Sequence, residues 1–399
     1  MKFDFTSIIE RKGHDAIAVD AIGTGNMVPA KEGFDPIPMW VADMNFPTCP
    51  TIQEAIIERV KHPTFGYYRP REEYFDAIIN WQKTRNGVGG LTKDDIGYEN
   101  GVLGGVASAL RALAQPGDAV LLHRPTYVGF TGTLTNAGYK IVHSDLYKDE
   151  EGIWRMDYDD MDQKIKENKI HVAIMCNPHN PCGRVWEKEE LEKAMEVYKA
   201  NDVFVISDEI WSDIILHGKH TPTQSVSEDA KMRTMAFYAT SKTFSLAGLV
   251  GSYHIIYSKY LRDRVQASAS KTHYNSMNVL SMYALIGAYR QEGQEWVDEL
   301  CEVLRDNCDY AYDYINEHFK GVKLQRAQGT YMLYLDCDEW IKAHDTDCDA
   351  LIRKGYEVGV YWQDGRPFKV DNTIRMNLAV PHTRVVEAFD RLDKYVFNA

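Results

Sequence analysis

The chain has 399 residues, of which 44% are hydrophobic and 12% aromatic, enough to build a buried core. This composition excludes disorder as a description of the whole chain. Lysine and arginine number 45 against 58 aspartate and glutamate residues, a net charge of −13. That balance disfavours sequence-independent binding to nucleic acid or to an anionic membrane surface. The length suits two domains, or one large α/β domain with an appendage.

Helical and strand-like segments alternate along the chain. Apolar residues at helical spacing predict helices over residues 51–62, 106–114 and 188–199. Short β-rich runs predict strands at residues 119–122, 171–175, 203–207 and 235–238. Strands separated by helices favour an α/β fold with a mostly parallel central sheet that is covered on both faces.

The pattern changes after about residue 290, where longer amphipathic segments appear. Residues 294–318 and 348–355 flank an apolar run at 330–335, which indicates a smaller α+β domain. We therefore predict a large domain over residues 63–288 and a small C-terminal domain over residues 289–399. Residues 1–62 are expected to form an N-terminal arm and part of the small domain.

Nothing in the sequence predicts a membrane span, a signal peptide or a metal site. No apolar run approaches the roughly 20 residues that a spanning helix needs, and charged residues follow soon after Met1. The seven cysteines are odd in number and scattered, so we expect reduced thiols in a cytoplasmic protein. Cys176 and Cys182 lie close together, but no second pair or histidine cluster completes a zinc site.

Polar residues follow three of the predicted strands. Asn180 comes after the strand at 171–175, Asp208 ends the strand at 203–207, and Lys242 comes after the strand at 235–238. In open parallel sheets, ligands bind beyond the carboxyl ends of the strands. We therefore expect these three residues to meet at one edge of the sheet.

Lys242 and Asp208 each allow two interpretations. A lysine amine can form an imine with an aldehyde cofactor, and enclosure lowers its pKa toward useful basicity; taken alone, Lys242 reads as a solvated surface residue. An aspartate at the end of an apolar strand is costly to bury unpaired. Asp208 is either a helix N-cap or the partner of a protonated pyridine nitrogen.

Several motifs together resemble the fold-type I pyridoxal-phosphate (PLP) enzymes of the class I/II aminotransferase superfamily. They are Asn180-Pro181-Cys182-Gly183, Asp208-Glu209-Ile210, Ser241-Lys242-Thr243-Phe244 with Ala247-Gly248-Leu249, and Ile374-Arg375-Met376. The segment Pro38-Met39-Trp40-Val41-Ala42-Asp43-Met44-Asn45-Phe46-Pro47-Thr48 is similar to that of the MalY/PatB-type cystathionine β-lyases, or C–S lyases. The likeness runs from about residue 35 to 380, nearly the whole chain.

The resemblance implies a role for each of these residues. Lys242 binds the PLP aldehyde, Asp208 its pyridine nitrogen and Asn180 its phenolic oxygen, and Asn180 and Ala42 also meet the substrate. Tyr127 stacks on the ring, the alternative being an ordinary core tyrosine. Arg375 clamps the substrate α-carboxylate with two parallel hydrogen bonds, the alternative being an ordinary surface salt bridge.

A glycine-rich segment fits the phosphate group of such a cofactor. Residues 100–106 open a predicted helix, and a helix N-terminus favours an anion. We expect the amides of Val102 and Leu103, with the Ser241 hydroxyl, to bind the phosphate. The spacing is neither a Walker nor a dinucleotide motif. By resemblance, Tyr67 reaches the phosphate of a neighbouring subunit, which implies a homodimer.

Two positions depart from the aspartate-type aminotransferase pattern. Val250 stands where many of these enzymes carry a phosphate-binding arginine, and Trp211 stands where they carry a tyrosine. An indole can donate one hydrogen bond but cannot accept one or ionise as a phenol does. The segment after Tyr127 also lacks the expected prolines. These departures are compatible with the lyase branch.

The resemblance implies α,β-elimination of cystathionine- or cysteine-type amino acids to pyruvate, ammonia and a thiol, with Lys242 as the general base. The alternative is an aminotransferase, because the first steps are shared. A third hypothesis is a regulatory or binding protein, whose activity would not require Lys242.

Overall fold

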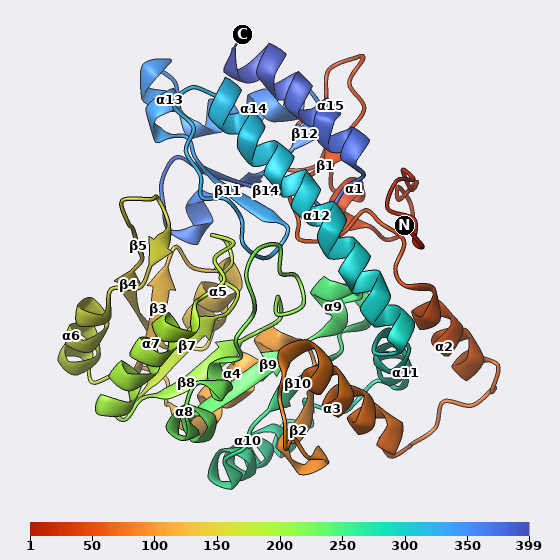
Figure 1. Cartoon of the computed structure of the whole chain (residues 1–399), viewed down its shortest axis with the longest axis vertical. Helices are drawn as coiled ribbons and strands as arrows, with labels where there is room; N and C mark the ends of the chain where they lie inside the picture. The colour runs from red at the N-terminus through yellow and green to blue at the C-terminus, as the bar shows by residue number, and fades with distance from the viewer. Residues whose placement is uncertain (399) are drawn as a thin grey trace.

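The computed structural model describes residues 1–398, and its centre is a seven-stranded sheet (Figure 1). The strand order is β2-β10-β9-β8-β7-β3-β4. The bounds are β2 (Ile96–Glu99), β3 (Ala119–Arg124), β4 (Lys140–Asp145), β7 (Val172–Cys176), β8 (Phe204–Asp208), β9 (Thr234–Tyr238) and β10 (Ser252–Ile255). The strands from β9 to β4 pair in parallel, whereas β10 pairs antiparallel with both β9 and β2. The mostly parallel α/β sheet predicted from the sequence is confirmed, and the antiparallel edge was not predicted.

Helices bury both faces of this sheet. They are α4 (Val102–Leu113), α5 (Val128–Asn136), α6 (Tyr158–Asn168), α7 (Lys188–Ala200), α8 (Glu228–Arg233) and α10 (Lys259–Ser270). In β3, Val120 and Leu122 join the apolar cluster that contains residues of α4 and α10, while Leu121 joins the cluster of α6 and α7. Successive side chains of a strand point to opposite faces, so the unbroken apolar runs of the sequence reflect a sheet that is covered on both sides.

The C-terminal part of the chain builds a separate small sheet (Figure 1). Strands β11 (Met332–Asp336), β14 (Thr373–Asn377) and β13 (Gln363–Asp364) pair antiparallel in that order. Around them lie α12 (Gln291–His318), α13 (Asp338–Ala343), α14 (Cys348–Glu357) and α15 (His382–Leu392). Other elements are α1 (Ile17–Asp20), α2 (Pro50–Val60), α3 (Glu72–Asn86), α9 (Thr240–Thr243), α11 (Val279–Ala288), β5 (Tyr147–Lys148) and β6 (Trp154–Arg155).

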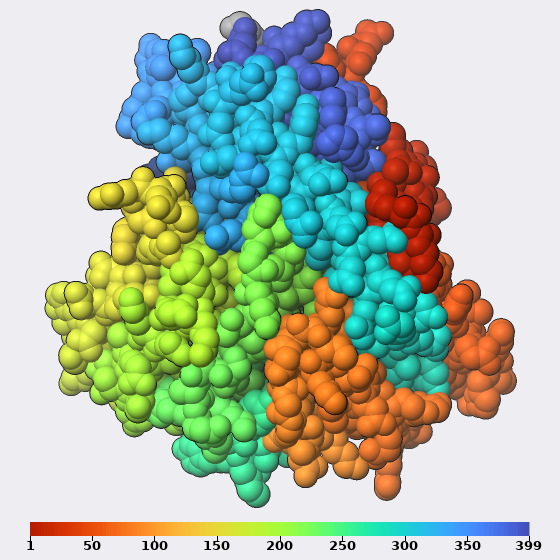
Figure 2. Space-filling view, viewed as in Figure 1, coloured from red at the N-terminus to blue at the C-terminus, as the bar shows by residue number. Residues whose placement is uncertain are grey.

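The N-terminal residues attach to this C-terminal part. Strand β1 (Ile37–Pro38) pairs in parallel with β12 (Val360–Tyr361), and the amide of Lys2 donates to Oε1 of Glu299 on α12 at 2.7 Å. Figure 2 shows the N-terminal segment, in red, lying against the cyan surface of α12. The exact domain boundaries stay a prediction.

The segment after β1 is held by the small sheet. The side-chain amide of Asn377, on β14, donates to the carbonyl oxygens of Val41 at 2.8 Å and Asp43 at 2.7 Å. These two bonds fix the backbone of residues 41–43 close to the carboxyl edge of the large sheet. Across residues 1–398, the helices are all too short or too polar to cross a bilayer. The seven cysteines are buried, free thiols.

Candidate active site

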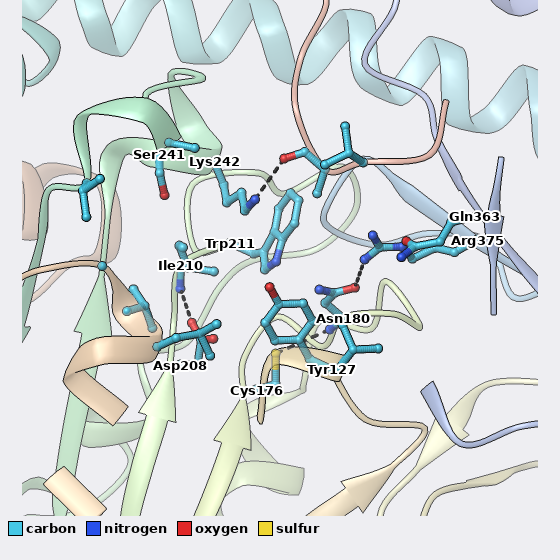
Figure 3. A pocket seen from close by; sticks show the side chains of 18 of the residues that line it. Tyr127, Cys176, Asn180, Asp208, Ile210, Trp211, Ser241, Lys242, Gln363 and Arg375 are labelled. Atoms are coloured by element: carbon cyan, nitrogen blue, oxygen red, sulfur yellow. Dashed lines mark hydrogen bonds between the residues drawn. The ribbon is translucent and has the colours of Figure 1, made fainter. Parts of the chain in front are cut away.

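A cavity of about 350 Å³ lies where β7, β8 and β9 end, between the large sheet, the segment after β1 and the small sheet (Figure 3). The edge of a parallel sheet beyond its carboxyl ends is the usual place for a ligand. The residues that line the cavity are Trp40, Val41, Ala42, Gly101, Val102, Leu103, Tyr127, Val128, Cys176, Asn180, Asp208, Ile210, Trp211, Ser241, Lys242, Ala247, Val250, Gly251, Gln363 and Arg375.

Lys242 enters the cavity from α9, the short helix that follows β9. Its Nζ donates to the carbonyl oxygen of Ala42 at 2.9 Å, and the Trp211 ring centroid lies 5.8 Å from Nζ. Burial, helped by the positive charge of Arg375, lowers the pKa of Lys242 to about 8. Of the described residues that line the cavity, Lys242 carries the one amine, and its pKa lies close to neutral pH.

Asp208 ends β8 and is 4% exposed. Its Oδ1 accepts a hydrogen bond from the amide of Ile210 at 3.1 Å. This bond and the charge of Lys242 only partly offset the cost of burial, which raises the pKa of Asp208 to about 7. A buried carboxyl group in this state gains stability from a cationic or N–H partner inside the cavity.

Arg375 and Asn180 meet on the other side of the cavity (Figure 3). Nη1 of Arg375 donates to Oδ1 of Asn180 at 2.9 Å, and the guanidinium group lies 4.7 Å from the ring centroid of Phe368. Arg375 is buried, and burial lowers its pKa to about 10. Its Nε is buried without a hydrogen-bond partner among residues 1–398. A guanidinium group with an unused buried donor suits a planar anion.

Tyr127 precedes α5, and its ring borders the cavity. An added Cβ at Gly129 would lie 2.5 Å from this ring, so the glycine leaves the space that the ring occupies. The Phe130 ring packs edge-on against it at 5.3 Å between centroids. Burial raises the pKa of Tyr127, which keeps the phenol neutral. The ring therefore offers the cavity a fixed aromatic surface.

The N-terminus of α4 opens into the cavity at Val102 and Leu103. Gly101 precedes the helix at φ 77°, a conformation that favours glycine, and no described side chain caps the helix. The first amides of a helix lack intrahelical partners and attract anions. Ser241 borders the same cavity. The chemistry of these groups suits a phosphate, and Val250, which also borders the cavity, brings no positive charge to this phosphate cradle.

The structure brings nine of the ten residues singled out from the sequence to this cavity. Ala42 lines the cavity, and its carbonyl oxygen accepts a hydrogen bond from Lys242. Tyr67 is fully exposed and does not line the cavity of its own chain. The sequence motifs did not indicate Gln363, which reaches the cavity only because β13 pairs with β14 opposite Arg375.

Arg184 fixes the loop that carries Asn180, and we expect its loss to destabilise the fold. Its buried guanidinium group donates to the carbonyl oxygen of Trp154 at 3.1 Å, to Oε1 of Gln328 at 2.6 Å and to the carboxylate of Glu190. In Arg184→Met, Glu190 keeps its ion pair with Arg155 at 2.9 Å. The loss of the other buried hydrogen bonds should still lower the free energy of unfolding by about 1–3 kcal/mol.

Chemical denaturation measures this loss, with the exposed Arg353→Met on α14 as the matched control. The control should change stability by less than about 0.5 kcal/mol. Equal stability of the two variants would show that the buried hydrogen bonds of Arg184 do not stabilise the fold.

Comparison with known proteins places the chain in a family. A model described as aminotransferase class I and II matches residues 36–392. Cystathionine β-lyase PatB of Bacillus subtilis is 35% identical over 322 residues, covering 80% of this chain and 82% of that protein.

Two solved structures are similar over nearly their full length. Cystalysin from Treponema denticola, crystallised with a PLP cofactor, superposes with a TM-score of 0.91 at 29% identity and covers 99% of both chains. The PLP-bound C–S lyase from Staphylococcus hominis superposes with a TM-score of 0.88 at 28% identity, covering 99% of this chain and 98% of that one. The chain therefore belongs to the aminotransferase class I and II family.

Proposed function

We propose that this chain is a PLP-dependent C–S lyase, which cleaves cystathionine- or cysteine-type amino acids to pyruvate, ammonia and a thiol. The observation that carries the proposal is one cavity that holds the Lys242 amine, the Asp208 carboxyl group and the Arg375 guanidinium group. The identity to a cystathionine β-lyase supports it.

The residues of the cavity fit PLP. The cofactor has an aldehyde, a basic pyridine nitrogen and a phosphate, and each finds a partner of matching chemistry. Lys242 offers an amine with a pKa of about 8, and Asp208 is a carboxyl group whose free-energy cost of burial is only partly offset by its neighbours.

The other cofactor groups also find partners. The N-terminus of α4 offers free amides at Val102 and Leu103 for the phosphate, and Ser241 adds a hydroxyl. Asn180 would bind the phenolic oxygen, and the Tyr127 ring would lie along the cofactor face.

Bound PLP supplies a carbonyl carbon that condenses with amines and a protonated ring that accepts the electron pair of a carbanion. Asp208 keeps the ring nitrogen protonated, because a buried carboxylate beside a pyridinium forms a favourable ion pair. Arg375 and Asn180 hold the substrate α-carboxylate and so orient the α-hydrogen toward Lys242.

Lys242 acts as the general base on the substrate α-carbon. A pKa of about 8 leaves a useful fraction of neutral amine near neutral pH. As the amine takes the α-proton, the bond between the β-carbon and sulfur breaks, and its electron pair leaves with the thiolate. Addition of water to the three-carbon remainder then gives pyruvate and ammonia. Trp40, Val41 and Trp211 give this part of the cavity apolar walls.

The active unit in this proposal is a homodimer. Ile57, Phe65 and Tyr67 are exposed apolar side chains close together in the sequence, and such clusters are typical of surfaces that bind another protein. Tyr67 from the second copy would add a hydroxyl donor to the phosphate cradle, where Val250 adds no hydrogen bond. This makes the cradle complete only in the dimer.

A panel of amino acids tests the proposed reaction. L-cystathionine and S-methyl-L-cysteine carry a sulfur leaving group on the β-carbon, whereas L-alanine and L-aspartate do not. We expect pyruvate from the first pair without any keto acid, and no turnover of the second pair. Conversion of alanine or aspartate that depends on 2-oxoglutarate, with no pyruvate from the thioethers, would instead identify an aminotransferase.

A further inference from the structure

Gln363 lies beside the Arg375 guanidinium group at the edge of the cavity (Figure 3). It is the first residue of β13, and in the antiparallel pairing with β14 it stands directly opposite Arg375. Directly opposed residues of antiparallel strands project from the same face, with Cβ atoms about 5 Å apart. Both side chains therefore reach the cavity from the small sheet.

Each of these two side chains has a buried polar atom without a partner. Among residues 1–398, Oε1 of Gln363 and Nε of Arg375 are buried and make no hydrogen bond. Buried polar groups are nearly always hydrogen-bonded, and an orphaned one calls for an explanation. Nε of Arg375 is a donor, so an anion in the cavity can bond to it directly, whereas Oε1 of Gln363 is an acceptor and the same anion can bond only to the N–H₂ group of that amide.

The other contacts of Arg375 limit what this ligand can be. Nη1 is engaged with Asn180 at 2.9 Å, and the Phe368 ring covers the guanidinium group at 4.7 Å. The edge of the guanidinium group formed by Nε and Nη2 remains available to a ligand. Such an edge can donate two parallel hydrogen bonds to a carboxylate. An amide carries both an acceptor and an N–H₂ donor at its end. Rotation about its last side-chain bond lets Gln363 donate to the same anion.

We propose that Gln363 is a second binding residue for the substrate α-carboxylate, acting beside Arg375. The inference rests on the proposed function only in that the substrate is an amino acid, and it holds for elimination and transamination alike. A neutral side chain is needed at this position. A carboxylate here would pair with Arg375 and occupy the edge that the substrate uses.

Equilibrium binding to the PLP-loaded enzyme tests the proposal without turnover. The probes are L-alanine and ethylamine, which differ only by the carboxylate, and the absorbance of the cofactor reports the binding of each. We expect Gln363→Leu to raise the Kd for L-alanine about 10-fold or more, because hydrogen bonds to charged groups are the strong ones. Gln363→Glu should raise it further, about 100-fold, whereas the Kd for ethylamine should stay within about twofold in both variants.

Steady-state kinetics with L-cystathionine gives a second readout. In Gln363→Leu, KM should rise in parallel with the Kd for L-alanine, while kcat stays within about threefold. Gln363→Glu has nearly the same shape as the parent residue and controls for packing. PLP content and the thermal unfolding temperature of each variant show that the fold is retained.

Two results would overturn the proposal. One is an unchanged Kd for L-alanine in both variants, and the other is an equal shift for L-alanine and ethylamine. The test also separates the two proposals. Parent enzyme that binds L-alanine but releases no pyruvate from cystathionine contradicts the lyase function and leaves the role of Gln363 intact.

Discussion

Lys242→Ala is expected to lower kcat/KM for L-cystathionine by about 10³-fold or more. A general base typically contributes 10²–10⁴-fold, and the same amine also binds the cofactor aldehyde in the proposed mechanism. Of the described residues at the cavity, Lys242 carries the one amine, and Arg375 is held by Asn180. No other residue of the described cavity lining can therefore both bind an aldehyde through an amine and act as the base.

Pyruvate release measured with PLP in excess checks this expectation. Lys259→Ala on the surface of α10 is the matched control, because Lys259 is exposed and pairs with Asp263. The control should retain full activity. A Lys242→Ala enzyme with more than about a tenth of the parent rate would remove the general base from the proposed mechanism.

Arg375→Leu is expected to lower kcat/KM by about 30-fold to 5,000-fold, mainly through KM. Truncating one partner of a buried, hydrogen-bonded charge pair costs about 2–5 kcal/mol, and the substrate carboxylate would lose that partner. Arg375→Lys should recover only a small part of the loss. Lysine keeps the charge but cannot supply the planar pair of donors that a guanidinium group offers.

Initial rates over a range of cystathionine concentrations separate KM from kcat. Arg353→Leu on α14 is a suitable control, since its side chain is largely exposed. If Arg375→Leu left KM unchanged and lowered kcat alone, Arg375 would act on the reacting atoms rather than on the carboxylate.

The sequence predicted four of the five parallel strands because these four are buried on both faces, and it missed β4, the edge strand, which is largely half-buried. Residues 171–175 and 203–207 are apolar runs followed by polar residues, and the structure places β7 and β8 within one residue of them. Strand β10 was not predicted. It pairs antiparallel with β9 on one side and with β2 on the other. The pairing with β2 joins residues about 150 positions apart, which no local pattern encodes.

In the candidate site too, local sequence predicts some residues, whereas others depend on pairing between distant strands. Asp208, Lys242 and Asn180 directly follow strands or end them, so the rule for parallel sheets was enough to bring them together. Gln363 depends on the register of a two-residue strand against β14, and such registers cannot be derived from residue types alone.

The two departures from the aspartate-aminotransferase pattern both lie at the cavity. Trp211 is almost fully buried, and its ring packs edge-on against Tyr331 at 4.7 Å between centroids. Val250 adopts φ 53° and lies at the open side, close to Gly101. A β-branched residue rarely adopts this conformation. In the proposed complex with PLP, backbone amides and hydroxyl groups would therefore bind the phosphate, because no arginine stands at this position.

Counting products per active site is the most direct test of the lyase function. Purified, PLP-loaded enzyme is incubated with excess L-cystathionine and no keto acid, and pyruvate and free thiol are measured over time. Elimination predicts equal amounts of pyruvate and homocysteine, continuing through many turnovers of each site. A reaction that stops after about one product per site and resumes only when a keto acid is added would contradict it, because transamination consumes the aldehyde form of the cofactor.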